Sequence, residues 1–363
     1  MKSVLHVSLF IAPIVVGTSS ATAAPKVIAD IGPVAGLVQA VLGDSAEVTA
    51  LVPANQSPHS AALRPSQARA AQEADLVIGI GPELTPGLWE KLDALAPNAQ
   101  IISLLDVEGT HLLEYSDDHD DHDDHDDHDD HDDHDHDDEK HADHDDHDDH
   151  DDHDHDDEKH ADHDDYDDHD HDDEKHADHD DHDDHDDHAG HDHSGTDPHA
   201  WLDPENAALW LDAIADALSE VDPSQAAVYE ANAVAEAQRI ASVSEQVVAQ
   251  LSEFGARSYA SGHDDMRYFA EHFGITRAAS VLDGDAAPAG AARTREVVEA
   301  IAANNVGCML TEDGHPSRLA EQLAADAKLP VLEYTPRGVD GQSYPDMLAA
   351  LGNTLAACLG PKG

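Results

Sequence analysis

"DPSQAAVYEANAVAEAQRIASVSEQVVAQLSEFG" (222–255) is a polar, alanine-rich run of the chain that contains no proline or glycine between Pro223 and Gly255. Asp222 suits the N-cap of a helix and Pro223 its first helical position, while Gly255 suits the position where a helix stops. The run therefore predicts one helix of roughly 30 residues, or about 45 Å. A helix of this length crosses a whole lobe and is able to join it to another.

On either side of this helix, short apolar runs alternate with amphipathic stretches of helical period. This alternation is typical of a parallel sheet with helices on both faces. The N-terminal side predicts strands at 27–31, 48–52, 74–80 and 101–105 and helices at 33–42, 64–73, 88–96 and 203–218. The C-terminal side predicts strands at 258–261, 276–282, 306–311 and 331–335 and helices at 266–273, 291–304, 315–327 and 344–359. The sequence thus predicts two α/β lobes, 24–221 and 256–363, joined by a linker helix, 222–255.

A tract of histidine and aspartate interrupts the first lobe at about 116–195. Residues 117–193 hold 24 of the 31 histidines and 44 of the 80 acidic residues. The stretch "DHDHDDEKHAD" occurs three times, from Asp133, Asp152 and Asp168. Because this composition offers almost no apolar surface to bury, the tract is predicted to be a disordered insertion.

The N-terminus has the pattern of a secretory signal. Lys2 precedes an apolar run at 4–16, and 21–23 is a small-residue cleavage motif, so residues 1–23 are predicted to be a signal peptide. No cysteine directly follows the apolar run, so no lipid anchor is expected, and no later stretch approaches the length of a membrane span. The formal net charge of −62 argues against nucleic acid and anionic membranes as partners and favours cationic ligands.

Outside the tract and the signal peptide, the chain has six histidines: His59, His111, His199, His263, His272 and His315. His59 and His263 follow the predicted strands 48–52 and 258–261, and His199 ends the loop that the tract interrupts. Ligands of open parallel sheets bind beyond the carboxyl ends of the strands, so these three side chains can meet in a cleft between the lobes. Three neutral imidazoles with one further ligand suit a tetrahedral zinc ion, and ordinary solvated loop side chains are the alternative.

Three segments of the chain carry a family resemblance. They are "ALVPANQSPHSAALRPSQARAAQEADLVIGIGPEL" (50–84), "TDPHAWLDPENA" (196–207) and "GHDDMRYFAEHFGI" (262–275). They resemble the signature segments of the zinc-binding solute-binding proteins of ABC importers, the ZnuA-type members of cluster A-I. A histidine- and acid-rich insertion before the second segment is typical of this family. The resemblance covers nearly all of the chain outside the tract and the signal peptide.

This resemblance implies two α/β lobes joined by one long helix, with Zn²⁺ bound in the cleft between them. The histidines that match the family's ligands are His59, His199 and His263. The resemblance also implies a periplasmic monomer that delivers zinc to the membrane permease of an ABC importer. Finally, it implies a disulfide between Cys308 and Cys358. From composition alone, an even pair in an oxidising compartment is most simply a disulfide, and two buried thiols are the alternative.

The fourth zinc ligand is where the chain departs from the family pattern. Many relatives place an aspartate shortly before the last helix, in a segment such as L-D-P-L-G. The matching stretch is "YTPRG" (334–338), with Thr335 in that position, and a threonine hydroxyl is a poor zinc ligand. A water molecule, Glu312, His315 or a histidine of the tract could each fill the fourth position.

Four more residues near the motifs are expected to have structural roles. His111 and His272 are predicted to be structural or surface residues. Trp201 is predicted to pack against the loop of His199 and fix it. Asp203 is predicted to cap the helix that begins at 204, and a hydrogen bond to a ligand imidazole is the alternative role.

The predicted function is therefore that of a zinc-binding transport protein without enzymatic activity. The tract is predicted to collect zinc weakly and to hand it to the cleft. A zinc hydrolase or hydratase is a second hypothesis, because three histidines and an open position also describe catalytic zinc, but the chain has no H-E-x-x-H motif. The motifs would also fit a relative specific for manganese or iron, or a zinc buffer that works without a permease.

Overall fold

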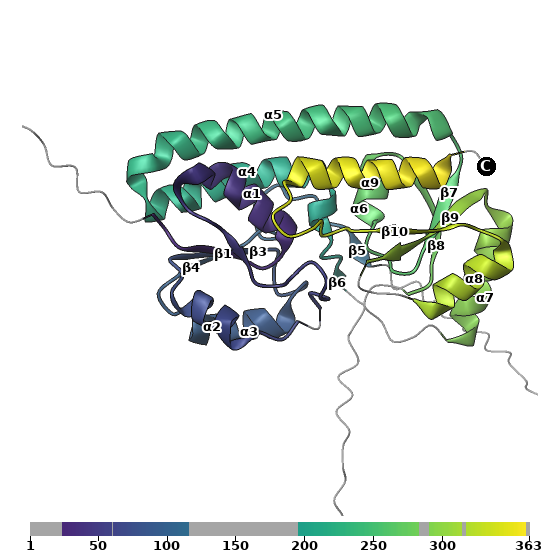
Figure 1. Ribbon diagram of the computed structural model, residues 1–363, viewed down its shortest axis with the longest axis horizontal. Coiled ribbons are helices and arrows are strands. Elements are labelled where there is room, and N and C mark those ends of the chain that lie inside the picture. The colour runs from purple at the N-terminus through teal and green to yellow at the C-terminus, as the bar shows by residue number, and fades with distance from the viewer. Residues whose placement is uncertain (1–23, 60, 116–194, 283–289, 314–316, 361–363) are drawn as a thin grey trace, which may run out of the picture. The chain divides into compact units, whose positions relative to one another are not determined.

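The computed structural model describes residues 24–59, 61–115, 195–282, 290–313 and 317–360 (Figure 1). The predicted signal peptide, the tract and His315 lie outside these ranges. Among the described helices, none is long and apolar enough to cross a bilayer.

The N-terminal half contains a parallel sheet of four strands in the order β2-β1-β3-β4. Its strands are β1 (Val27–Ala29), β2 (Thr49–Ala50), β3 (Leu76–Gly79) and β4 (Gln100–Ser103). Side chains alternate across the sheet: Val27 packs toward α1 (Gly32–Leu42) and α4 (Pro204–Val221), and Ile28 packs toward α2 (Pro65–Gln72) and α3 (Pro86–Leu95). Helices therefore cover both faces of this sheet, as predicted (Figure 1).

The C-terminal half repeats the plan, with a parallel sheet in the order β10-β9-β7-β8. Its strands are β7 (Ser258–Ser261), β8 (Thr276–Ser280), β9 (Val306–Glu312) and β10 (Val331–Tyr334). Tyr259 and Leu310 join the core with α6 (Arg267–His272) and α9 (Tyr344–Leu359), while Ala260 and Met309 join the core with α7 (Ala291–Ala303) and α8 (Arg318–Ala327). The prediction of two parallel α/β sheets is confirmed.

The predicted long helix is α5 (Ala226–Leu251), 26 residues or about 39 Å in length. A short 3₁₀ turn precedes it, in which the carboxylate of Asp222 accepts a hydrogen bond from the backbone N–H of Ser224 at 3.2 Å. A second such turn follows it and ends at Gly255, whose φ of 58° favours glycine. The helix packs against α1 and α4 of the first half and α9 of the second, so it links the two (Figure 1).

Two further connections tie together segments that are distant in sequence. Cys308 of β9 and Cys358 of α9 form a disulfide, which confirms the predicted pairing and ties the last helix to the second sheet. A short antiparallel pair, β5 (Glu114–Tyr115) with β6 (Gly195–Thr196), was not predicted. It joins the two described segments that flank the tract.

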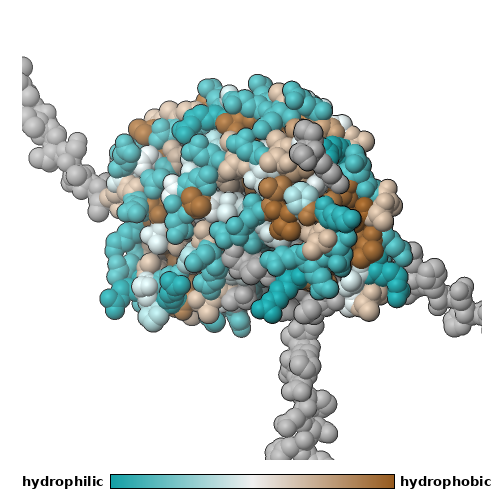
Figure 2. All heavy atoms as spheres, turned by 45° about the vertical axis from the view of Figure 1, so that its right-hand side comes forward, coloured by the Kyte–Doolittle hydropathy of each residue, from teal (hydrophilic) through white to brown (hydrophobic). Residues whose placement is uncertain are grey.

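The face of the molecule drawn in Figure 2 is largely hydrophilic, with hydrophobic side chains in small separate groups. An interaction surface on that face would therefore be built mainly from polar side chains.

Candidate metal centre

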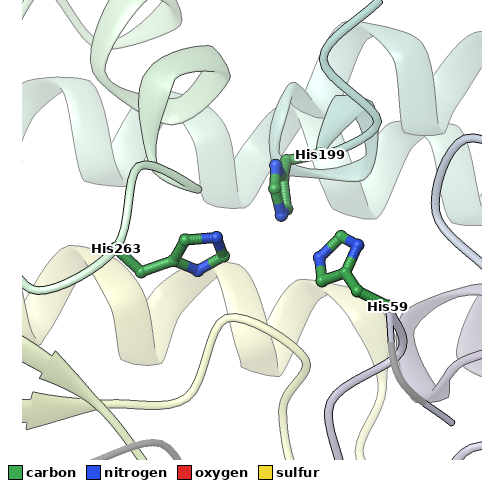
Figure 3. Close-up of side chains that lie close together, drawn as sticks. All are labelled: His59, His199 and His263. Carbon is green, nitrogen blue, oxygen red and sulfur yellow. The ribbon is translucent and has the colours of Figure 1, made fainter. Parts of the chain in front are cut away.

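Three imidazoles from three separate segments converge at one point. His59 lies in the loop between β2 and α2, His199 follows β6, and His263 follows β7. Each offers a ring nitrogen within 4.8 Å of those of the other two. The ring centroids are 5.4 Å apart for His59 and His199, 6.1 Å for His59 and His263, and 5.2 Å for His199 and His263. Figure 3 shows the three rings pointing toward one another.

His199 is held by Asp197, two residues before it. The carboxylate of Asp197 lies 2.7 Å from Nδ1 of His199 and accepts its backbone N–H at 3.0 Å. A proton on Nδ1 leaves Nε2 as the nitrogen with a lone pair, which is the tautomer that a metal-binding imidazole needs. Burial lowers the pKa of His199, but the charge and hydrogen bond of Asp197 outweigh it, so the pKa lies above its ordinary value.

Asp197 is itself held from the C-terminal half. It is fully buried, and Nη1 of Arg267 in α6 lies 3.3 Å from its carboxylate. The hydroxyl of Tyr268 donates to the Asp197 carbonyl at 2.7 Å, and the hydroxyl of Tyr115 donates to the carboxylate at 3.4 Å. Arg267 also donates to the carbonyl of Glu114 at 2.9 Å. The orientation of His199 therefore depends on α6 and on the short strand pair beside the tract.

Trp201 packs as predicted. It is buried in the 3₁₀ turn Ala200–Leu202, and its ring centroid is 5.2 Å from that of His199. Its indole N–H donates to the carbonyl of Pro336 at 2.9 Å, and the hydroxyl of Tyr344 donates to the carbonyl of Trp201 at 2.7 Å. Both partners belong to the segment that connects β10 to α9 and begins that helix, so Trp201 joins the His199 loop to the C-terminal half.

His263 lies beside two carboxylates. Its Nδ1 is 3.5 Å from Oε2 of Glu312 and 3.9 Å from Oδ2 of Asp265. The Tyr334 hydroxyl donates to Oδ1 of Asp265. Burial raises the pKa of Asp265 to about 6, against the opposing effect of His263. Glu312 pairs with Arg337, whose Nη2 lies 2.6 Å from Oε1.

The loop of His59 has little regular structure and is fixed by side chains of other segments. At its start, the side-chain amide of Gln67 in α2 donates to the carbonyl of Leu51. In its middle, Arg337 donates to the carbonyl of Gln56, and the backbone N–H of Ala54 donates to Asp340 at 3.4 Å. Residues of the β10–α9 connection thus hold a loop of the N-terminal half.

His111 and His272 lie outside the cluster and share one carboxylate. Asp203 caps α4 by accepting the backbone N–H of Glu205 at 2.9 Å. Nδ1 of His111 and Nδ1 of His272 lie 3.0 Å and 3.1 Å from its two oxygens. Burial raises the pKa of Asp203, but the hydrogen bonds from these groups outweigh it, so the pKa lies below its ordinary value. The predicted cap is confirmed, and the imidazoles that Asp203 holds are His111 and His272.

Sequence reasoning did not single out Asp197, Asp265 and Arg337. The first two lie two residues before His199 and two residues after His263, and this spacing is a signal that could have found them. Arg337 contacts Glu312 only because β9 and β10 are neighbours in the sheet. No local sequence pattern predicts that contact. The structure assigns neither Glu312 nor water as a fourth ligand.

The donor set has a definite chemical preference. Neutral imidazoles bind zinc and similar borderline ions, and a carboxylate behind the imidazole fixes its orientation and raises its basicity. The arrangement can hold one such ion between the two halves of the molecule.

Comparison with known proteins gives matches along almost the whole chain. The family model described as zinc-uptake complex component A, periplasmic (ZnuA) matches residues 27–358. The chain is 38% identical over 341 residues to the high-affinity zinc uptake system protein ZnuA of Paracoccus denitrificans, a match that covers 93% of this chain and 92% of that protein. It is 30% identical over 347 residues to the protein of the same name from Brucella abortus, with 94% of each chain covered.

Solved structures share the fold. A crystal structure of ZnuA has a TM-score of 0.66 at 19% identity and covers 93% of this chain and 100% of its own. A manganese-bound periplasmic metal binding protein from candidatus liberibacter asiaticus has a TM-score of 0.61 at 18% identity and covers 92% and 98%. A cadmium-bound form of a periplasmic metal binding protein from the same source is also similar, with a TM-score of 0.63.

Proposed function

We propose that this chain, which belongs to the ZnuA family of periplasmic zinc-uptake components, captures Zn²⁺ and delivers it to the membrane permease of an ABC importer. The observation that carries the proposal is the convergence of His59, His199 and His263 from three loops, with ring nitrogens within 4.8 Å of one another. Relatives that match over 93% and 94% of the chain are named as high-affinity zinc uptake proteins.

Zinc is the ion that this donor set favours. Three neutral imidazoles suit zinc, whereas manganese prefers carboxylate and water oxygens. Structures of similar fold hold manganese or cadmium, so the fold alone does not decide the ion. Thr335 stands where many relatives have an aspartate, which makes the site less suitable for manganese. We propose Zn²⁺ as the transported ion, with water or His315 as its fourth ligand, because Arg337 already pairs with Glu312, the other candidate.

A transport role fits the surroundings of the histidines better than catalysis. A zinc hydrolase needs a general base that can take a proton from the bound water. Asp197 and Glu312 are the carboxylates nearest to His199 and His263, and each is paired with an arginine, Arg267 or Arg337. Both carboxylates are therefore already engaged by a cation. We propose no enzymatic activity.

The tract, residues 116–195, is proposed to collect zinc weakly for the tight site. Its histidines and carboxylates are numerous and chemically alike, so they would bind several ions with low selectivity. The strand pair β5–β6 supports a supply role, because it ends only three residues before His199. We also propose that the protein is exported by a cleaved signal peptide and works as a monomer.

A zinc titration with a competing chelator tests the proposal. The wild-type chain should bind one ion tightly and several weakly. His59→Ala, His199→Ala and His263→Ala should each lose the tight ion and keep the weak ones, and deletion of residues 117–193 should do the reverse. In that deletion, a two-residue turn can close the chain, because β5 and β6 are paired antiparallel. Tight binding that survives all three histidine substitutions would refute the proposed site.

A further inference from the structure

A second group of ligand-type side chains lies beside the three histidines and shares one of them. His263, Asp265 and Glu312 each offer an atom within 4.8 Å of those of the other two. This group has two carboxylates and one imidazole, which suits harder ions such as Mn²⁺, whereas three imidazoles suit zinc. Two donor sets of different ion preference therefore lie side by side at the centre.

A permanent cation already neutralises part of the carboxylate set. Nη2 and Nε of Arg337 donate to Oε1 of Glu312 at 2.6 Å and 3.2 Å. The two side chains are only 4% and 7% exposed, so water screens their attraction little. A guanidinium keeps its proton throughout the range in which proteins are stable. The positive charge beside Glu312 is therefore always present.

Arg337 is also fixed in place. Its Nη1 donates to the carbonyl of Gln56, three residues before His59. Its neighbour Pro336 accepts the indole N–H of Trp201 at 2.9 Å, and Gly338 has a φ of 63°, which favours glycine. The guanidinium cannot leave Glu312 without breaking contacts on both sides of the centre.

Asp265 has no such partner cation. Its Oδ1 accepts the hydroxyl of Tyr334, but its Oδ2 is buried and has no hydrogen-bond partner among the described residues. The nearest ring nitrogen, Nδ1 of His263, lies 3.9 Å from Oδ2, which is beyond hydrogen-bond length. A buried carboxylate oxygen without a partner is a strong acceptor for a cation. In the second group, Arg337 thus neutralises Glu312, whereas Asp265 can still accept a cation.

We propose that Arg337 is a specificity-determining residue: by neutralising Glu312 it denies the Asp265–Glu312 carboxylates to a divalent ion and confines binding to the three imidazoles. The inference rests on the proposed function, since it concerns which ion that same centre selects. If the guanidinium is removed, Glu312 needs another cation, and a divalent ion beside His263 and Asp265 supplies it. Mn²⁺ should then gain affinity relative to Zn²⁺.

The test uses the full-length chain with a neutral residue of similar length, Arg337→Met. Mn²⁺ binding is measured from the EPR signal of free Mn²⁺, and Zn²⁺ binding by chelator competition. The weak sites of the tract are present in every variant, so differences between variants report on the centre. Arg239→Met is the matched control, because Arg239 pairs with Glu236 on α5 and is 63% exposed.

Arg337→Met should bind one Mn²⁺ at least about tenfold more tightly than the wild type, since a buried carboxylate that has lost its partner recovers a strong attraction to cations. Arg337→Met/Glu312→Gln should lose this gain, and Arg239→Met should match the wild type. If Arg337→Met folds only with metal, recovery of its near-UV circular dichroism by Mn²⁺, absent in the double variant, gives the same answer.

An unchanged Mn²⁺ affinity, or a gain that persists in the double variant, would overturn the inference. Failure of the wild type to bind zinc would instead overturn the proposed function.

Discussion

His199 and His263 are both candidate ligands whose Nδ1 atoms face carboxylates, but they are held very differently. His199 is 2% exposed, and Asp197 contacts it at 2.7 Å and also accepts its backbone N–H. His263 is 15% exposed, and its two carboxylates are 3.5 Å and 3.9 Å from Nδ1. These distances are longer than an ordinary hydrogen bond. Asp197 therefore orients the His199 ring by a short contact, whereas the two carboxylates beside His263 lie farther from its ring.

This difference gives the N-terminal and C-terminal halves of the molecule different roles in the proposed binding of the ion. A preorganised ligand costs little conformational entropy when the ion arrives, whereas a ligand that must be ordered weakens the binding. In the proposed site, His199 of the N-terminal half is held in place before the ion arrives, and His263 of the C-terminal half completes the ligand set. The carboxylates behind the two rings should consequently contribute unequally to affinity.

The largest effect is expected for Asp197→Ala. It removes the acceptor of His199 and leaves Arg267 with an unpaired charge, so the dissociation constant of the tight zinc site should rise about 100-fold, at the upper end for residues that orient a metal ligand. Chelator competition measures the change, with Asp346→Ala, an exposed carboxylate at the start of α9, as the control. A change below threefold would break the comparison, because His199 would then not depend on its close partner.

The pH dependence of zinc binding should show the influence of Asp197. Zinc binds only the unprotonated Nε2, so affinity falls about tenfold per pH unit below the pKa of a ligand imidazole. Burial lowers the pKa of His199 and Asp197 raises it by more, so the net pKa lies above 6.5 and the loss should begin above that pH. Asp197→Asn removes the charge that raises this pKa, so the loss should begin at a lower pH. Isothermal titrations from about pH 5 to 8 test this sign, and an unmoved onset would contradict it.

Asp265→Asn should have a smaller effect than Asp197→Ala. The carboxylate is 3.9 Å from the His263 ring, so its removal costs long-range attraction to the ion but no short hydrogen bond. The zinc dissociation constant should rise by about threefold to tenfold. The same competition assay measures it, and a loss equal to that of Asp197→Ala would show that both imidazoles are held alike.

The smallest effect on affinity is expected for Tyr268→Phe. Its hydroxyl donates to the carbonyl of Asp197, not to the carboxylate, and it accepts the backbone N–H of Leu113 at 2.8 Å. The free energy of unfolding should fall by about 1–2 kcal/mol, while zinc affinity should change less than threefold. Denaturant unfolding and zinc competition on the same sample separate the two quantities. A large loss of affinity would show that the hydrogen bond to the Asp197 carbonyl also orients His199.

Much of the fold followed from local patterns, and the exceptions have a physical reason. The bounds of β7 and α9 coincide with the predicted 258–261 and 344–359, since Ser343 caps α9 and Gly360 ends it. The strand predicted at 48–52 is only Thr49–Ala50, because only these two residues are in register with β1, its one neighbour in the sheet. The pair β5–β6 was missed because its strands have two residues each and lie 80 positions apart in sequence.

The candidate site also has features that could be predicted from the sequence and features that could not. The convergence of His59, His199 and His263 could be predicted, because each follows a strand end and matches a motif of the family. Their assignment as metal ligands stays a prediction. The partnership of Arg337 with Glu312 could not be predicted, because it requires the neighbouring positions of β9 and β10. Strand ends and family motifs thus pointed to the imidazoles, whereas the charges around them depend on tertiary structure.

The strand pair β5–β6 has a consequence for how this protein can evolve. It pairs Tyr115 with Gly195 across the whole length of the tract. The repeated "DHDHDDEKHAD" units can therefore multiply or disappear by unequal recombination without altering the register of the segment that carries His199. If the tract collects zinc as proposed, its capacity can change with its length while the geometry of the three-histidine cluster is kept.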